Sequence, residues 1–383
     1  MALVEDLLEA SHHMAADALT EMVRTHAGAA GFLEADLYLV DYEQVSLVRL
    51  PAPGDEVVSL AIDSTMAGRA FISGELVATP VEGGERLWTI LLDGGERLGV
   101  MGVTVAVADD ATRRHCWALA SAVALLVVAK RSYTDQQELC RRTRLPSLAS
   151  ELQLQMLPPL TFVDPRFVIA GVLEDAYDTG GDAFDYAVNG PVAHFAIFDA
   201  MGHGMHASLL AASVVVAYRS SRRRGLTLAE TYVALDEVVV RQFGGEVFVT
   251  AQLGQLHVGT GEFTWVNAGH PAPLIVRGGR NVSTLECAPS LPLGMTGPVV
   301  ELAASRLSRG ERLLFFSDGV VDAKAPDGDP FGEGRLADTL QTASMAGVSP
   351  AETMRRLLLA VLGHQGSQLT DDASMVMVEW RSE

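Results

Sequence analysis

The stretch 179–204 constrains this chain more than any other, because it places two aspartates at the ends of two apolar segments. Asn-Gly-Pro at 189–191 separates the segments, and this combination favours a tight turn. A strand rises about 3.3 Å per residue, so an antiparallel hairpin at this turn brings Asp182 and Asp199 side by side. The sequence therefore predicts a pair of carboxylates at one end of a buried hairpin.

Two further acidic sites follow the same pattern. The strand-like run 312–316 leads into Ser-Asp-Gly, which contains Asp318, and Thr-Asp-Asp at 370–372 precedes the apolar run 374–380. Neighbouring carboxylates repel one another unless a positive charge lies between them, and a divalent cation is the simplest remedy. Because no Cys or His cluster accompanies these acids, the pattern favours Mg²⁺ or Mn²⁺ over zinc.

Composition excludes several other classes of protein. The 383 residues suffice for two or three domains, and 49% hydrophobic with 20% charged residues indicates a folded chain. The formal net charge is −20 and there are only two lysines, so we expect no binding to nucleic acid through a basic surface.

The cysteines and the apolar runs bear on the compartment. Cys116, Cys140 and Cys287 are odd in number and widely spaced, which favours neither a disulfide framework nor a zinc site. The longest apolar run, 117–129, is shorter than the roughly 18 residues that a membrane span needs, and residues 1–8 carry acids rather than a basic leader. We therefore expect a cytoplasmic protein with no membrane partner.

Residues 1–130 show helical spacing first, then alternation, then helical spacing again. The predicted helices are 4–26, 64–73 and 111–128, and the predicted strands are 37–40, 45–50, 57–62, 88–92 and 98–107, the last two joined by a turn at 93–96. This layout resembles a GAF-type small-molecule sensor domain with α/β/α layers, and the PAS type is its neighbour in architecture. An interaction domain without a ligand is the alternative, since fold does not fix function.

A helical linker is predicted over 131–160. The closing helix of the first domain is expected to continue to Arg144, and the helical region 115–157 is a candidate homodimer contact. A solvated linker is the alternative, because the apolar seam is interrupted by polar residues. Pro146 opens a short helix with the stripe Leu148, Leu152 and Met156, which either carries a signal between the domains or only covers a sheet face.

Residues 161–383 are predicted to form one domain in which strands come in two runs and helices in two pairs. This pattern favours an α+β fold, an α-β-β-α sandwich of two mostly antiparallel sheets. Thr227 with Glu230 forms a capping-box pattern at the start of the helix 227–243. Arg222 to Arg224 are interpreted as a solvated helix end.

Eight motifs in order identify a family. They are T-G-G-D-A-F-D, D-A-M-G-H-G, F-V-T-A-Q-L, N-A-G-H-P, P-L-G, G-E-R-L-L-F-F-S-D-G-V-V-D-A, F-G-E-G-R-L and T-D-D-A-S. Together they resemble the PPM-type metal-dependent serine/threonine protein phosphatases, in particular the bacterial branch typified by the stage II sporulation protein E and by regulators of the general stress sigma factor. The resemblance covers about 158–380.

The resemblance implies a centre of two Mn²⁺ or Mg²⁺ ions. Asp182 and Asp199 would hold it, with Asp199 bridging and Ala183 contributing its backbone carbonyl. Asp318 and Asp371 would complete the second metal's ligands, so the implied catalytic residues are Asp182, Asp199, Asp318 and Asp371. Asp372 ranks behind Asp371, because the wider family often has Asn at this position.

Other polar residues near these motifs have open roles. His203 is either a ligand or part of a turn, and the same choice applies to Asn267, Gly269 and His270. Asp185 and Asp322 either lie behind the metal ligands or face solvent. Arg166 is the only arginine close before Asp182, so a phosphate clamp is not evident and the metals are expected to hold the phosphate.

The resemblance implies hydrolysis of phosphoserine or phosphothreonine on a partner protein. That partner would be a phosphorylated anti-sigma-factor antagonist, and the N-terminal domain would control the reaction. Two alternatives stay open: a degenerate phosphatase that acts as a signalling scaffold, and an always-active enzyme attached to a ligand-gated switch. Because no Cys lies in the motifs, a cysteine-dependent phosphatase is not expected.

Overall fold

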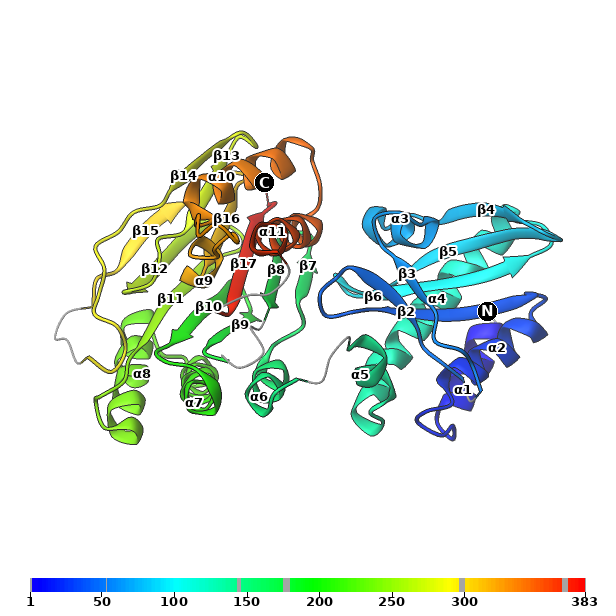
Figure 1. The fold of residues 1–383 in the computed structure, drawn as a ribbon, viewed down its shortest axis with the longest axis horizontal. Coiled ribbons are helices and arrows are strands. Elements are labelled where there is room, and N and C mark those ends of the chain that lie inside the picture. Colours follow the sequence, from blue (N-terminus) through cyan, green and yellow to red (C-terminus); the bar gives the residue numbers. More distant parts are fainter. Residues whose placement is uncertain are drawn as a thin grey trace. The chain divides into compact units, whose positions relative to one another are not determined.

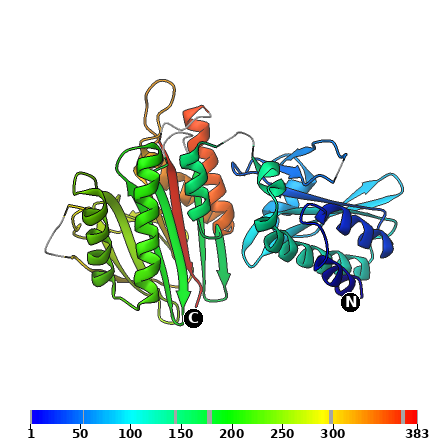
Figure 2. The same cartoon turned by 90° about the horizontal axis from the view of Figure 1, so that it is seen from below.

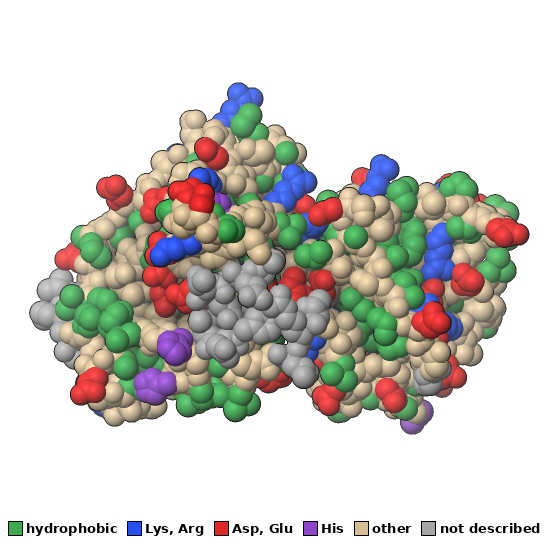
Figure 3. Space-filling model, in the orientation of Figure 1, with side chains coloured by type: hydrophobic (Ala, Val, Ile, Leu, Met, Phe, Trp, Pro, Cys, Tyr) green, Lys and Arg blue, Asp and Glu red, His purple; other side chains and the backbone are tan. Residues whose placement is uncertain are grey.

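The structure is a computed structural model that describes residues 2–52, 54–142, 146–174, 180–295, 300–366 and 371–382. It divides the chain into two compact units, Met1–Leu145 and Pro146–Glu383, and the division falls inside the predicted linker 131–160 (Figure 1). The expectations that involve Arg144, Thr179 and Thr370 lie outside the described residues. Acidic side chains are exposed on both units (Figure 3), as the net charge leads one to expect.

The first unit is built on an antiparallel sheet with strand order β3-β2-β1-β6-β5-β4. Its strands are β1 (Glu34–Val40), β2 (Ser46–Arg49), β3 (Ser59–Ala61), β4 (Val77–Val81), β5 (Gly84–Asp93) and β6 (Glu96–Val105). The predicted turn at 93–96 is confirmed, since Asp93 pairs with Glu96. The pattern did not predict β4, because Pro80 interrupts it; an edge strand tolerates this proline.

Helices cover both faces of this sheet. On one face, α1 (Ala2–Ser11), α2 (Leu19–Ala29) and α4 (Asp110–Lys130) enclose a core, and on the other α3 (Met66–Ser73) packs against the sheet through Phe71. The prediction of one helix over 4–26 was wrong. Ser11 donates its hydroxyl to the carbonyl of Leu8 at the end of α1, and the chain then turns so that both helices face the same core.

The predicted continuation of the closing helix to Arg144 is also wrong over the described residues. After α4 the chain forms a 3₁₀ turn, η1 (Arg131–Tyr133), and a short helix, α5 (Gln136–Arg141). Thr134 between them has extended backbone, with φ −151°, which ends the helical path. The Gln137 amide donates to the carbonyl of Val127 in the last turn of α4, and α5 contacts β1 and β2.

One helical stretch has the length and composition of a membrane span. It is Asp110–Tyr133, with a mean hydropathy of 1.3 over its most apolar window, of which 44% is buried inside the first unit. Leu119, Val123 and Val127 on this stretch lie in the core beside β5, so the packing accounts for their apolar character.

The second unit contains two sheets in which all the pairings between named strands are antiparallel. One sheet has the order β15-β12-β11-β10-β9 and the other β14-β13-β16-β17-β8-β7. The first sheet contains β9 (Asp182–Asn189), β10 (Val192–Ala200), β11 (Val249–His257), β12 (Glu262–Ala268) and β15 (Ala303–Arg306). The second contains β7 (Thr161–Asp164), β8 (Phe167–Glu174), β13 (Leu274–Arg277), β14 (Asn281–Thr284), β16 (Arg312–Phe316) and β17 (Ala373–Trp380).

Helices cover the outer face of each sheet, as Figures 1 and 2 show. The helices α6 (Leu148–Met156), α7 (Gly204–Arg223) and α8 (Leu228–Phe243) lie over the first sheet, with α7 in contact with both α6 and α8. The helices α9 (Asp318–Val321), α10 (Gly332–Met345) and α11 (Pro350–Gln365) lie over the second. The capping box of Thr227 and Glu230 starts α8 as predicted.

The two sheets enclose an aromatic core between them. Phe195, Phe263 and Phe315 meet there, with the Phe195 and Phe315 ring centroids 5.3 Å apart. This layer order confirms the predicted α+β fold with an α-β-β-α sandwich. The short edge strands in this unit are β7, β14 and β15.

Candidate metal centre

The predicted hairpin of β9 and β10 forms, and its register places Asp182 directly opposite Asp199. Successive side chains on a strand point to opposite faces. Phe184 and Ile197 lie in the core between the two sheets, a space that we call the seam. Asp182 and Asp199 are each two residues away from one of them and therefore point into the same seam. Asp182 is 3% exposed. The site therefore begins with two carboxylates at one end of the seam.

The second sheet completes the site through the Ser-Asp-Gly motif after β16. Ser317 donates its main-chain N–H to the carbonyl of Ser374, and its hydroxyl accepts from the N–H of Ser374 at 3.0 Å. These bonds fasten the end of β16 to the start of β17. A Cβ on Gly319 would lie 2.0 Å from the carbonyl oxygen of Asp372, so only glycine lets α9 approach this closely. Asp318 is thereby brought beside Asp371.

The carboxylates interact with one another electrostatically. Burial, followed by the charges of Asp199 and Asp372, raises the pKa of Asp182 well above its usual range. Burial, followed by the charges of Asp318, Asp371 and Asp372, raises the pKa of Asp199 to about 7. Burial also raises the pKa values of Asp318 and Asp371. Acids from β9, β10, α9 and the residues just before β17 therefore influence one another's pKa values.

Asp199 has a hydrogen-bonded support on the neighbouring strand that the sequence did not reveal. Thr250 lies opposite it on β11, and the Thr250 hydroxyl bond lowers the Asp199 pKa in part. Thr250 Oγ1 is also 2.8 Å from Nδ1 of His270. Burial lowers the pKa of His270 to about 3, so its imidazole is neutral. His270 thus contacts Asp199 indirectly, through Thr250.

Asn267 and His270 form the tight turn that was one of the two open alternatives. The Asn267 side chain accepts from the His270 N–H at 2.8 Å and donates to the His270 carbonyl at 2.9 Å. Gly269 between them has φ +71°, and a Cβ there would lie 2.7 Å from the Pro292 ring. The motif N-A-G-H-P therefore builds the loop that carries His270.

Asp185 neither lies behind the metal ligands nor faces solvent, and Arg222 of the arginine triplet is not solvated. Asp185 is 2% exposed and binds Arg219, 2.9 Å away, and Arg222, whose side chain is 8% exposed. The interpretation of Arg222 as a solvated helix end was therefore wrong, because α7 turns this residue inward under the sheet. Asp185 faces the helix layer and not the seam, since its neighbour Phe184 points into the seam.

The remaining expected residues lie at the edge of the site or outside it. His203 occupies the N-cap position of α7, is exposed, and makes no side-chain cap bond. Asp322 is exposed at the end of α9, near enough to raise the pKa values of Asp318 and Asp371. Arg166 binds Asp164 in the turn between β7 and β8, beyond the end of β8 that pairs with Trp380. It is therefore no phosphate clamp.

Ala183 pairs with Phe198 in the β9–β10 ladder, and its side chain packs in the helix-facing core. The neighbouring carbonyl, that of Asp182, accepts a hydrogen bond of 2.7 Å from the amide of Gln153 on α6. The same amide donates to Asp372 at 2.9 Å. The expected apolar stripe of α6 is wrong at Leu148, which is 74% exposed. Gln153, completely buried, takes the inward position.

The site suits a hydrated hard cation. Its donors are oxygens, and Asp182 Oδ2 is buried and has no hydrogen-bond partner among the residues that the structure describes. In the part of the chain that the structure describes, no group of three His, Cys, Asp or Glu side chains is close enough together to hold a metal ion directly. Mg²⁺ usually keeps several waters and binds through one or two carboxylates. Carboxylates that lie near one another without forming a complete set of ligands fit this mode of binding, because water molecules supply the remaining ligands.

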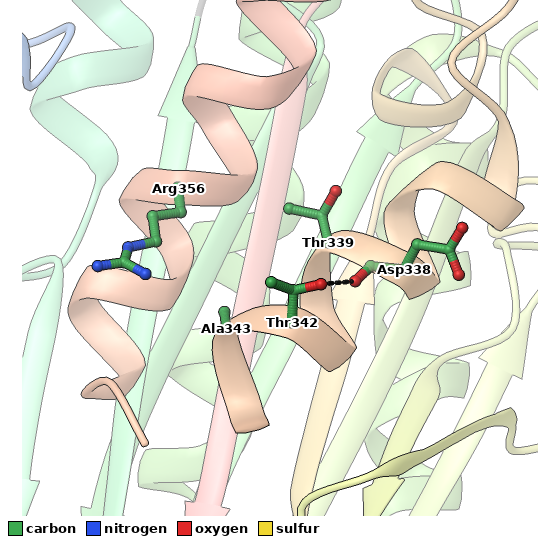
Figure 4. A pocket seen from close by; sticks show the side chains of 5 residues that line it. All are labelled: Asp338, Thr339, Thr342, Ala343 and Arg356. Carbon is green, nitrogen blue, oxygen red and sulfur yellow. Dashed lines mark hydrogen bonds between the residues drawn. The ribbon is translucent and has the colours of Figure 1, made fainter. Parts of the chain in front are cut away.

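A depression of about 250 Å³ lies elsewhere, between α10 and α11 (Figure 4). Its hydroxyls are bound within their own helix: Thr342 donates to the Asp338 carbonyl and Thr339 to that of Arg335. Arg356, across from them on α11, pairs with Glu352. This depression lies on the outer helix layer, whereas the acids lie at the end of the seam.

The fold and the acidic seam together define the sandwich of PPM-type phosphatases, also called PP2C domains. The family model described as stage II sporulation protein E (SpoIIE) matches residues 190–381. This chain therefore belongs to the SpoIIE family. The match begins after Asp182, so the β9–β10 register is what places that residue in the site.

Three similar proteins show how much of the chain resembles known sequences and structures. Protein IcfG of Synechocystis sp. is 28% identical over 34% of this chain and 20% of its own length. Phosphoserine phosphatase RsbU of Bacillus subtilis is 23% identical over 60% of this chain and 68% of its own. The crystal structure of the RsbU and RsbW domains of a Mycobacterium tuberculosis protein is 26% identical, with a TM-score of 0.51, over 57% of this chain and 63% of that one. The chain thus spans between a fifth and about two thirds of these relatives.

Proposed function

We propose that this chain is a metal-dependent protein phosphatase that hydrolyses phosphoserine or phosphothreonine on a partner protein. The observation that carries the proposal is the buried pair Asp182 and Asp199, whose pKa values are raised by burial and by other carboxylates. Membership of the SpoIIE family supports it, as does the similarity to RsbU, which is named a phosphoserine phosphatase.

The proposed ligands of two Mn²⁺ or Mg²⁺ ions are Asp182, Asp199, Asp318 and Asp371, with the Ala183 carbonyl. Such ions neutralise phosphoryl oxygens and lower the pKa of an attacking water towards neutrality. The chain's own part is positional: the hairpin holds Asp182 opposite Asp199, and the Ser317 bonds hold the end of β16 to the start of β17, beside Asp318 and Asp371. Asp372 is directed at Gln153 and the Asp182 N–H, which supports ranking it behind Asp371.

For the partner, we propose a phosphorylated anti-sigma-factor antagonist in the cytoplasm, by analogy with the RsbU-type relatives. We further propose that the first unit is a GAF-like sensor that regulates hydrolysis, with the helical region 115–157 as a homodimer contact. A depression of about 610 Å³ on its sheet supports ligand binding. Tyr38 and Trp88, 5.6 Å apart between ring centroids, line it together with Arg86.

The test is release of phosphate from a phosphoserine protein in the presence of Mn²⁺. The wild-type chain is expected to release phosphate and Asp199→Asn is not. Equal rates for the two proteins would overturn the assignment of the site. Retained binding of the phosphoprotein without any hydrolysis would favour the scaffold alternative.

A further inference from the structure

The depression of about 610 Å³ in the first unit lies on the sheet face that also carries α3. Val40 on β1 and Val100 on β6 pack in the core under α3. Because side chains alternate along a strand, Asp36 on β1 and Thr104 on β6 lie on the same face as these valines. Thr104 lines the depression, so polar residues continue this face where the apolar core ends. A hollow of this volume is in the range of small-molecule sites.

Two aromatic residues lie at the border between the covered core and the depression. Tyr38 and Trp88 pack in the core under α3 and also line the depression, and their rings meet edge to face. Gly102 is paired with Trp88 on the neighbouring strand, and a Cβ on this glycine would lie 2.6 Å from the indole. Glycine thus lets the indole lie across β6. Trp88 is half-buried, which leaves part of its ring accessible to a ligand.

Arg86 lines the depression, but its guanidinium is already bound by protein acceptors. The residue is 9% exposed. Nη2 donates to Asp36 at 2.6 Å, and Nη1 donates to Glu34 at 3.2 Å and to the hydroxyl of Thr104 at 3.0 Å. The guanidinium carbon also lies 5.2 Å from the centre of the Trp88 ring. A ligand phosphate or carboxylate would have to displace these bonds, so the site disfavours an anion.

Negative charge exceeds positive charge around the depression. Its lining residues include two acids, Glu34 and Glu82, and one base, Arg86. The Glu34 side chain is 70% exposed, and Glu82 is exposed in the turn between β4 and β5. Burial would raise the pKa of Asp36, but hydrogen bonds from Arg24 and Arg86 hold that pKa below its usual value, so Asp36 is also charged. The charge that complements this surface is positive.

We propose that this depression binds a planar aromatic molecule that carries a positively charged amine, with its ring against Trp88 and Tyr38 and its amine at Glu34 and Glu82. An aromatic ring packs on an accessible indole, and a cation is attracted both by the ring face and by the carboxylates. The inference rests on the sensor role proposed for the first unit and deepens it, because it names the chemical class of the ligand.

The probe is tryptamine, an indole that carries a primary amine, and its control is indole-3-acetate, the same ring with a carboxylate. Binding to the full chain is measured by titration calorimetry. We expect tryptamine to bind about tenfold or more tightly than indole-3-acetate, since only its charge complements the site. No tryptamine binding up to about 10 mM, or binding of indole-3-acetate that is as tight, would overturn the proposal.

Matched variants locate the bound probe. Glu82→Gln keeps the shape of the side chain and removes its charge, so tryptamine affinity should fall about threefold. Glu75→Gln is the control, because this exposed glutamate precedes β4 and does not line the depression. Trp88→Leu should lower the affinity about tenfold through loss of the ring. Thermal unfolding checks that each variant folds, and unchanged affinity in Glu82→Gln would overturn the proposal even if Trp88→Leu is unstable.

A further variant and an activity assay separate this proposal from the proposed phosphatase. Asp199→Asn should leave tryptamine affinity unchanged, and a fall would place the amine at the acidic seam and overturn the proposal. If wild type releases phosphate but does not prefer tryptamine to indole-3-acetate, the ligand class is wrong and the phosphatase stands. If tryptamine binding depends on Glu82 but no phosphate is released, the ligand site stands and the phosphatase function is wrong.

Discussion

Asp182 and Asp185 lie three residues apart on the same strand, and each is at most 3% exposed, yet their surroundings are opposite. Asp185 faces the helix layer, where Arg219 and Arg222 neutralise it. Asp182 faces the seam, where Asp199 and Asp372 add negative charge and raise its pKa. The charge of Asp185 is neutralised by arginines of the protein itself, whereas the charge of Asp182 requires a cation that the protein binds.

This difference separates stability from function on a single hairpin. A buried ion pair that loses one partner leaves an uncompensated charge, so Asp185 is needed for folding. A cluster of like charges strains the folded state, and it is tolerated where a ligand relieves it. Variants at the two sites therefore affect different properties, turnover at one and folding at the other.

Removing an acid from the seam should have the largest effect on turnover. Asp199→Asn is expected to lower the phosphatase rate by roughly 10³-fold or more, because it removes the carboxylate proposed to bridge the metals. The metal-free variant should be at least as stable as wild type, since repulsion is relieved. Steady-state kinetics with Mn²⁺ and urea unfolding measure the two effects, and a strongly destabilised variant would contradict the comparison.

Removing the acid from the helix-facing side should instead affect folding. Asp185→Asn keeps the shape of the side chain and leaves Arg219 and Arg222 without their carboxylate. The free energy of unfolding is expected to fall by about 3–5 kcal/mol. Urea unfolding measures this loss, while Mn²⁺ affinity of the remaining folded protein should stay within about twofold. Lost Mn²⁺ binding at full stability would reverse the assignment of the two aspartates.

Stability of the metal-free protein should depend on Asp199 between about pH 4 and pH 7. The folded pKa of about 7 lies above the ~3.9 of an unfolded aspartate, so the folded state binds the extra proton in this window. Its stability is therefore lost as the pH rises, by an amount on the order of a few kcal/mol. The difference between wild type and Asp199→Asn, from urea unfolding in chelator, should show this fall. A difference that is flat or rises would contradict it.

The smallest effect is expected from Arg219→Lys, which keeps the charge beside Asp185. Lysine cannot reproduce the two guanidinium bonds to Oδ1 of Asp185 together with the bond to the Met156 carbonyl. A loss of about 1 kcal/mol in unfolding free energy is expected, with Mn²⁺ affinity unchanged. A loss as large as that of Asp185→Asn would mean that geometry, and not charge, dominates this pair.

The pairing of Asp182 with Asp199 could be predicted from the sequence because it depends on residues that are close together in the chain. The turn at 189–191 fixes the register, and the register fixes that Asp182 lies opposite Asp199. Asp318 and Asp371 could be predicted because each adjoins an apolar strand, and the order of strands and helices predicted the layered fold. These features depend on residues close in the chain, which a pattern can show.

The residues that were missed depend on the rotation of helices against the sheets. Arg222 lies 37 residues from Asp185 in sequence, and only the rotation of α7 brings the two together. Gln153 was hidden because Leu148 has the same helical spacing as an apolar stripe, although it faces solvent. Thr250 lies opposite Asp199 in the neighbouring strand. It was missed because threonine is common in strands and does not by itself indicate a role in a site.

The first unit shows the same limit. Its sheet could be predicted from alternation, but the break between α1 and α2 could not, because no proline or glycine marks it. The end of α4 depends on Gln137 and Thr134, whose hydrogen bonds a helical pattern does not reveal. Polar side chains that end helices are weaker sequence signals than the apolar residues that build them.

The most direct test of the central claim is calorimetric titration of Mn²⁺ at pH 6 in two buffers with different ionisation enthalpies. It counts both the ions bound and the protons released. Because the pKa values of Asp182 and Asp199 are both raised, we expect two ions to bind with release of protons, and Asp199→Asn to release fewer protons than wild type. Absence of binding, or binding by Asp199→Asn with the same proton release as wild type, would contradict the account.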